Sequence, residues 1–135
     1  MNRRKAREEV FTILFERRFN PEIPAEEFYQ GAIASREIED DEYIRSVFFG
    51  VEENKKELDE RSDKFFNNWK RSRISAVSES VIRIAVYEMM HTEIPHRVSI
   101  NEAIELSKKF DDDKAKNFIN GVLNSVSKEL EAGNE

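Results

Sequence analysis

The sequence contains no cysteine, which excludes disulfide bonds, thiolate nucleophiles and cysteine-ligated metal sites. Glycine and proline are scarce, at four and three residues, while 37% of the residues are charged, a composition that favours long surface helices over sheets. No apolar run approaches the roughly 20 residues that a membrane span needs, and the charged N-terminal stretch is unlike a signal peptide. We therefore expect an all-α, soluble, cytoplasmic protein with no membrane partner.

The length of 135 residues suits one domain with its own hydrophobic core. No internal repeat, low-complexity tract or long linker interrupts the chain. The sequence therefore predicts a single compact domain over residues 1–135.

Charge is distributed unevenly along the chain. The formal net charge of −6 argues against indiscriminate coating of nucleic acid, because phosphates would be repelled over most of the surface. Residues 1–18, however, carry six basic and three acidic side chains, so that a local basic patch precedes an acidic body.

Apolar residues recur at helical spacing and predict about six or seven helices. The expected helical segments are residues 3–18, 24–36, 43–69 with a break or bend between 51 and 58, 74–93, 99–110 and 118–130. Ser99 and Glu102 match a capping box at a helix start, and Asp111–Asp113 would cap the last helix. Gly121 lies inside that helix, where glycine is costly, so we expect another helix to approach it closely.

Catalytic groups are hard to find in this sequence. His91 and His96 flank Pro95 in an expected loop, without partners at metal-ligand spacing. Asp111–Asp113 lacks the alternating ligands and central glycine of a calcium loop. We expect no enzyme activity, no cofactor and no metal.

The basic residues of the first helix are more informative. Arg3, Arg4, Lys5 and Arg7 occupy a first turn where acidic residues would suit the helix dipole better. Phosphate binding explains them simply, and an unliganded, solvated basic end explains them equally well from composition alone.

Two further basic groups contain aromatic residues, a combination that single-stranded RNA sites use for base stacking and backbone binding. They are Lys70, Arg71 and Arg73 beside Trp69, and Lys108, Lys109, Lys114 and Lys116 around Phe110 and Phe118. Helical spacing favours a core position for Trp69 and leaves Phe118 ambiguous. Phe110, which precedes the acidic turn, is the better candidate for an exposed base platform.

Several ordered blocks of this sequence resemble the NusB transcription antitermination family, and the resemblance spans almost the whole chain. They are residues 3–8 (RRKARE), Trp69 ahead of Ile74, residues 81–88 (VIRIAVYE), Ile94-Pro95, residues 100–110 (INEAIELSKKF) and residues 117–123 (NFINGVL). Residues 20–60 match in pattern only.

The resemblance implies two helical bundles packed in one domain, and binding of boxA-type single-stranded RNA from ribosomal RNA operons together with NusE, a ribosomal small-subunit protein. Other Nus factors and RNA polymerase would be indirect partners. By the same resemblance, the RNA-binding residues would be Arg3, Arg4, Lys5, Arg7, Phe110, Lys114, Lys116 and Phe118. Glu79 and Arg83 would lie near the NusE interface.

Two departures from the family pattern bear on base preference: Phe15 stands where many relatives have tyrosine, and Lys114 follows an unusually acidic turn. The fold also resembles the N-terminal part of some ribosomal RNA methyltransferases, but no βαβ cofactor unit follows here. The alternative function is a protein-interaction module without RNA binding. The sequence is compatible with both a monomer and a homodimer.

Overall fold

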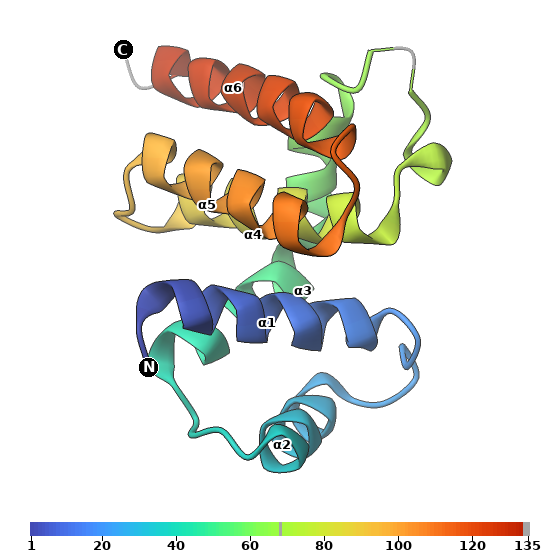
Figure 1. Cartoon of the computed structure of the whole chain (residues 1–135), viewed down its shortest axis with the longest axis vertical. Coiled ribbons are helices and arrows are strands. Elements are labelled where there is room, and N and C mark those ends of the chain that lie inside the picture. The colour runs from blue at the N-terminus through green and yellow to red at the C-terminus, as the bar shows by residue number, and fades with distance from the viewer. Residues whose placement is uncertain (68, 134–135) are drawn as a thin grey trace. The chain divides into compact units, whose positions relative to one another are not determined.

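The structure is a computed structural model that describes residues 1–67 and 69–133, and its helices are labelled in Figure 1. They are α1 (Arg3–Arg17), α2 (Ala25–Arg36), α3 (Glu42–Asp63), the short 3-10 turn η1 (Arg71–Arg73), α4 (Ala76–His91), α5 (His96–Phe110) and α6 (Ala115–Gly133). The described residues contain no β-strand, which confirms the all-α prediction. None of these helices is long and apolar enough to cross a membrane. The chain divides into two compact units, Met1–Glu53 and Asn54–Glu135.

The first unit comprises α1, α2 and the first half of α3. Its centre is an aromatic cluster in which the ring of Phe48 lies 5.2 Å from that of Tyr29 and 5.0 Å from that of Phe49. Tyr29 is fully buried and its hydroxyl donates to Asp40 at 2.8 Å. Burial and this hydrogen bond raise the pKa of Tyr29 above its ordinary range.

Helix α3 contains the bend that the sequence predicts between residues 51 and 58. Asn54 departs from helical geometry, with φ −113° and ψ 17°, and the second unit begins at the same residue. The helix begins where the Oδ1 atom of Asp41 accepts a hydrogen bond from the Ile44 amide at 3.0 Å. The acidic cluster before α3 therefore supplies its cap.

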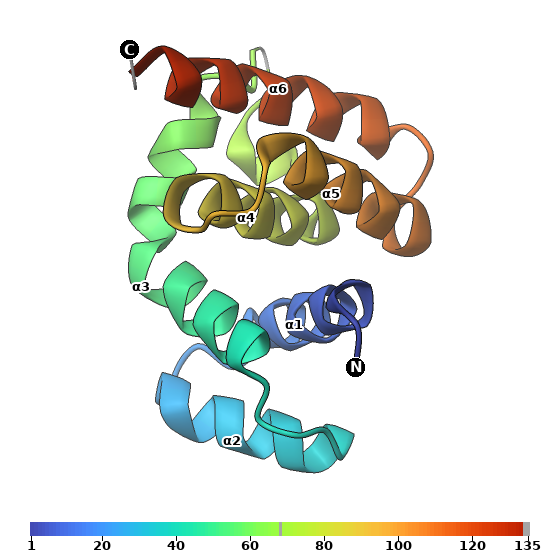
Figure 2. The same ribbon diagram turned by 90° about the vertical axis from the view of Figure 1, so that its left-hand side faces the viewer.

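The second unit comprises the rest of α3, η1, and helices α4, α5 and α6. Helices α4, α5 and α6 contact one another in all three pairs (Figure 2). Helix α6 contributes an inner face of fully or almost fully buried side chains: Ile119, Val122, Leu123 and Val126. The predicted 3.6-residue spacing of these residues is confirmed.

Two predicted helix starts are wrong. Helix α5 begins at His96, directly after Pro95, so Ser99 lies inside the helix rather than at its cap. Ser99 is buried and its hydroxyl donates to the carboxylate of fully buried Glu88 at 2.8 Å. Helix α4 begins at Ala76 rather than Ile74, because the Ser75 hydroxyl accepts from the Ser78 amide and caps the helix.

The expected close approach of another helix to Gly121 is also wrong. Gly121 is exposed, and a Cβ atom added there would meet no atom of the described residues within 4 Å beyond its own helix turn. The glycine faces outward because the buried residues of α6 occupy the opposite side of the helix.

Candidate nucleic-acid interface

The predicted basic residues at the start of α1 do not share one environment. Arg3, Arg4 and Lys5 are exposed, and the first turn contains no acidic residue. The guanidinium carbon of Arg3 lies 4.3 Å from the centre of the Tyr43 ring. The Nζ atom of Lys5 lies 3.3 Å from a carboxylate oxygen of Glu9, an ion pair that the spacing of the two residues allows.

Arg7 differs from the other three predicted cations. It is only 4% exposed, and its guanidinium carbon lies 5.6 Å from the centre of the Tyr43 ring. The structure thus corrects the expectation that Arg7 presents its charge at the surface. Its position one helical turn after Arg3 brings both side chains to the same ring. Its neighbours Ala6 and Val10 are buried with it on the inward side of α1.

Glu9 links α1 to α2 within the first unit. It is 6% exposed and accepts a hydrogen bond from the Nε atom of Arg36 at 2.6 Å. Burial alone would raise the pKa of Glu9, but Arg36 and Lys5 together hold it below its ordinary range. The carboxylate therefore stays ionised beneath the exposed cations of α1.

An open pocket lies in the second unit, between the segment before α4 and the start of α6. Its volume is about 320 Å³ and its lining residues are Trp69, Arg73, Ile74, Ser75, Ser78, Asp111, Asp112, Lys114, Ala115 and Phe118. The indole of Trp69 lies 6.3 Å from the ring of Phe118, edge to face. Phe66 packs on Phe118 from within, at 5.4 Å between ring centres.

Trp69 is 57% exposed, so its predicted core position is wrong. Its large ring follows α3 in a segment without regular helix, where helical spacing no longer indicates burial. The sequence did contain the signal that identifies it, because cations follow it directly at Lys70, Arg71 and Arg73.

The acidic residues of the pocket are held by hydrogen bonds. One oxygen of Asp111 accepts from the hydroxyls of Ser75 and Ser78 at 2.8 and 3.0 Å. Asp112 accepts from the amides of Lys114 and Ala115 at 3.0 and 3.1 Å, which confirms the predicted acidic cap of α6. Lys114 and Arg73 are exposed at the rim. The two carboxylates thus hold the turn between α5 and α6 in place, and the two cations are exposed to solvent.

The remaining predicted RNA-binding residues lie around the same end of α5 and α6. Phe110, the last residue of α5, is 39% exposed, and the Nζ atom of Lys109 lies 5.6 Å from its ring centre. Lys116 is partly buried in the first turn of α6. Of the four predicted residues in this unit, Lys114 and Phe118 line the pocket, and Phe110 and Lys116 do not.

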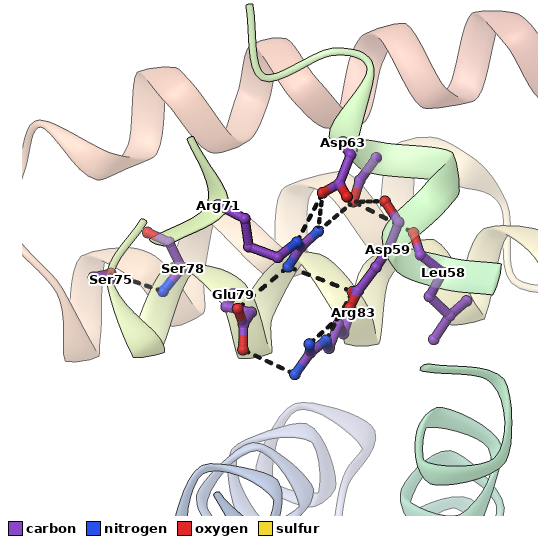
Figure 3. Close-up of polar contacts among 9 residues, drawn as sticks. Leu58, Asp59, Asp63, Arg71, Ser75, Ser78, Glu79 and Arg83 are labelled. Atoms are coloured by element: carbon purple, nitrogen blue, oxygen red, sulfur yellow. Dashed lines mark hydrogen bonds and ion pairs between the residues drawn. The ribbon is translucent and has the colours of Figure 1, made fainter. Parts of the chain in front are cut away.

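Glu79 and Arg83, predicted near a partner interface, belong to an ion-pair network inside the second unit (Figure 3). Arg83 binds both carboxylate oxygens of Asp59 at 2.9 and 2.8 Å, and it pairs with Glu79 at 2.9 Å. The side chains of Glu79 and Arg83 are 11% and 14% exposed. The network therefore leaves only a small part of either side chain accessible to a partner.

Arg71 joins this network to the pocket. Its guanidinium pairs with Asp63, with Asp59 at 3.4 Å and with Glu79 at 3.3 Å, so that it connects α3 to α4 (Figure 3). The segment between Asp63 and Arg71 carries Trp69, whose amide donates to the carbonyl of Phe66 at 3.0 Å. The ion pairs thereby hold the segment that forms one wall of the pocket.

Other sites for chemistry are not evident in the part of the chain that the structure describes. No group of three or more histidine, aspartate or glutamate side chains there could hold a metal ion. The histidines lie at helix ends rather than in a loop, with His91 Nε2 3.0 Å from Glu57 and His96 Nδ1 2.8 Å from the Ser127 hydroxyl.

Comparisons with known proteins agree with this arrangement. The transcription antitermination protein NusB of Clostridium botulinum is 42% identical over 135 residues, which cover 95% of this chain and 99% of the relative. The structure of T. maritima NusB superposes with a TM-score of 0.85 at 30% identity, covering 96% of this chain and 92% of that one. A crystal structure of the antitermination factors NusB and NusE in complex with double-stranded RNA gives 0.80 at 25% identity, covering 96% and 99%.

The family model that matches is that of the NusB family, and it matches residues 4–128. This match includes the pocket and all but the first of the exposed basic residues of α1. The chain belongs to the NusB family.

Proposed function

We propose that this protein is a transcription antitermination factor that binds boxA-type single-stranded RNA of ribosomal RNA operons together with the ribosomal protein NusE. The observation that carries the proposal is the open pocket that exposed Trp69, Phe118 and the exposed cations Arg73 and Lys114 line together. As a member of a family of antitermination proteins, the chain is a regulatory protein rather than an enzyme.

The pocket suits an unpaired base. Aromatic faces stack on bases of any sequence, and each stacked base contributes about 1–3 kcal/mol. Arg73 and Lys114 supply positive charge for the adjoining phosphates, although the whole chain has a net charge of −6. A base in duplex RNA could not enter such a pocket, so single-stranded RNA is the better ligand.

The exposed cations of α1, in the first unit, are a separate proposed RNA-binding segment. Arg3, Arg4 and Lys5 would bind phosphates, and Arg7 would support them from its buried position beside Tyr43. Phe110 and Lys116 remain predicted RNA-binding residues outside the pocket. These roles rest on exposure, charge and the family resemblance.

NusE is the proposed protein partner, since a NusB protein forms a complex with NusE and double-stranded RNA in a structure similar to this one. Through NusE the complex would join other Nus factors and RNA polymerase in the cytoplasm. A NusE contact at Glu79 and Arg83 stays a prediction. Their ion pairs leave only a small part of each side chain exposed for such a contact.

The test is fluorescence anisotropy of a short boxA-type RNA titrated with the protein, with and without NusE, at two salt concentrations. We expect salt-sensitive binding that NusE strengthens, and a loss of about tenfold or more in Trp69→Ala. An RNA with scrambled sequence is the control for specificity. Binding of NusE without any RNA affinity at low salt would favour the protein-interaction module instead.

A further inference from the structure

The outer face of α6 carries a stripe that has no carboxylate between Asn117 and Lys128. Five exposed residues form this amide stripe: Asn117, Asn120, Gly121, Asn124 and Lys128. Their spacing of three and four residues places them on one side of the helix. The opposite side holds the buried residues that pack against α4 and α5.

The charge of α6 is unusual for this chain. Residues 114–128 include three lysines and no acidic residue, although acidic residues outnumber basic ones in the whole sequence by 28 to 22. The first carboxylate of the helix, Glu129, is neutralised by Arg61 at 2.6 Å and Lys64 at 2.7 Å. These cations hold the pKa of Glu129 below its ordinary range. The stripe thus offers amide groups and the ammonium of Lys128, with no carboxylate between Asn117 and Lys128.

Gly121 has no structural explanation within the described chain. Glycine inside a helix costs about 1 kcal/mol relative to alanine, and no neighbour comes within 4 Å of where its Cβ would be. A missing side chain lets another molecule approach the helix backbone closely. Its position between Asn120 and Asn124 places that approach in the middle of the stripe.

The stripe is continuous with the pocket. Lys114, Ala115 and Phe118 line the pocket and belong to the start of α6 or directly precede it. Gly121 lies three residues after Phe118, and Lys114 lies three residues before Asn117, so both pairs are neighbours on the surface of α6 and its first turn. From Phe118 to Lys128 the helix rises by about 15 Å, which is enough to follow a strand beyond one base.

We propose that the amide stripe of α6 is a second RNA-binding segment, along which the strand runs when it leaves the Trp69–Phe118 pocket. Asparagine amides both donate and accept hydrogen bonds, as base edges and ribose hydroxyls require, and Lys128 binds a phosphate at the far end. Gly121 admits the sugar-phosphate backbone. The absence of carboxylates from residues 114–128 favours a polyanion over a protein partner. This inference rests on the proposed RNA binding.

The test replaces amides by carboxylates of nearly the same shape. Asn120→Asp and Asn124→Asp should each weaken RNA binding roughly threefold to tenfold, because a negative charge then faces the strand. Asn101→Asp is the matched control, since Asn101 is also exposed but lies on α5. We expect it to leave RNA affinity unchanged.

Glycine offers a second matched pair. Gly31 of α2, like Gly121, is exposed and has open space around it. Gly121→Glu should weaken RNA binding, whereas Gly31→Glu should not. Circular dichroism and thermal unfolding of every variant separate lost binding from lost structure.

The outcomes separate this inference from the proposed function. Unchanged RNA affinity in Asn120→Asp, Asn124→Asp and Gly121→Glu, with loss in Trp69→Ala, would overturn the stripe and leave the pocket in place. Weakened NusE binding with unchanged binding to RNA alone would assign the stripe to the protein partner and overturn it as an RNA site. A wild-type protein without RNA affinity would overturn both.

Discussion

The guanidinium carbon of Arg71 lies 5.0 Å from the centre of the Phe66 ring. Through this contact the ion-pair network of α3 and α4 meets the aromatic stack, because Phe66 packs on Phe118 in turn. The charged groups and the aromatic pocket therefore form one connected structure, in which Arg71 positions the segment that carries Trp69.

We expect Arg71→Ala to weaken RNA binding about threefold to tenfold without removing a contact to RNA, because the wall of the pocket loses its support. The free energy of unfolding should fall by only about 1 kcal/mol, since the network is partly exposed. Arg71→Lys should rescue binding only in part, because an ammonium cannot bridge three carboxylates as a guanidinium does. Equal RNA affinity in wild type and Arg71→Ala would show that the pocket wall needs no such support.

Trp69 is the only tryptophan of the chain and provides an intrinsic probe of the pocket. Because it is 57% exposed, we expect its fluorescence emission to be that of a largely hydrated indole. Stacking on a base should quench this emission in a saturable way, with the same dissociation constant as the anisotropy titration. Emission typical of a buried indole in the free protein would contradict the open pocket.

The basic residues of α1 should separate into two classes. Arg3→Ala with Arg4→Ala should weaken RNA binding and reduce the slope of log K against log salt by roughly 1–2, with the fold intact. Arg7→Ala should instead lower the free energy of unfolding by about 1–3 kcal/mol, because it empties a buried position beside Tyr43. Salt-dependent binding and urea unfolding measure the two effects. A pure binding defect in Arg7→Ala would contradict its buried position.

Gly121→Ala should stabilise the protein by about 0.5–1 kcal/mol, because alanine favours the helix and its Cβ points into open space. Gly31→Ala in α2 should give a similar gain for the same reason. Urea unfolding midpoints of the two variants and the wild type measure this. Strong destabilisation in Gly121→Ala would mean that a neighbour does pack there.

Acid should destabilise the first unit through Glu9. The pKa of Glu9 is lower in the folded protein than in the unfolded chain, so the unfolded chain binds more protons as the pH falls. Its contribution to stability is complete above the ordinary carboxyl pKa of about 4.5 and is lost as the pH drops toward the lower, folded value. Glu9→Gln should be less stable at neutral pH and should lose stability less steeply below about pH 4.5. Parallel pH profiles for the two proteins would exclude this role.

The sequence by itself determined the helical architecture. Apolar residues at 3.6-residue spacing, together with Asp41, Asp112 and the prolines, located the helices and about half of their ends, because helix formation depends on local interactions. The ordered motifs also identified the family. The Ser99 capping box failed because a serine can cap a helix or bind a buried carboxylate, and the sequence does not place Glu88 opposite it.

The tertiary structure alone decided which side chains face outward. Arg3 and Arg7 lie on the same side of α1 and both reach the Tyr43 ring, yet Arg3 is exposed and Arg7 is buried, because only packing shows how much of each side chain its surroundings cover. Trp69 was misplaced for the same reason, because its surroundings include residues distant in sequence such as Phe118. Gly121 is different: the predicted buried residues of α6 already placed it on the outer side of the helix, and only its expected neighbour was wrong. The pocket itself brings together residues 69–78 and 111–118, and no local pattern specifies a contact between segments more than thirty residues apart.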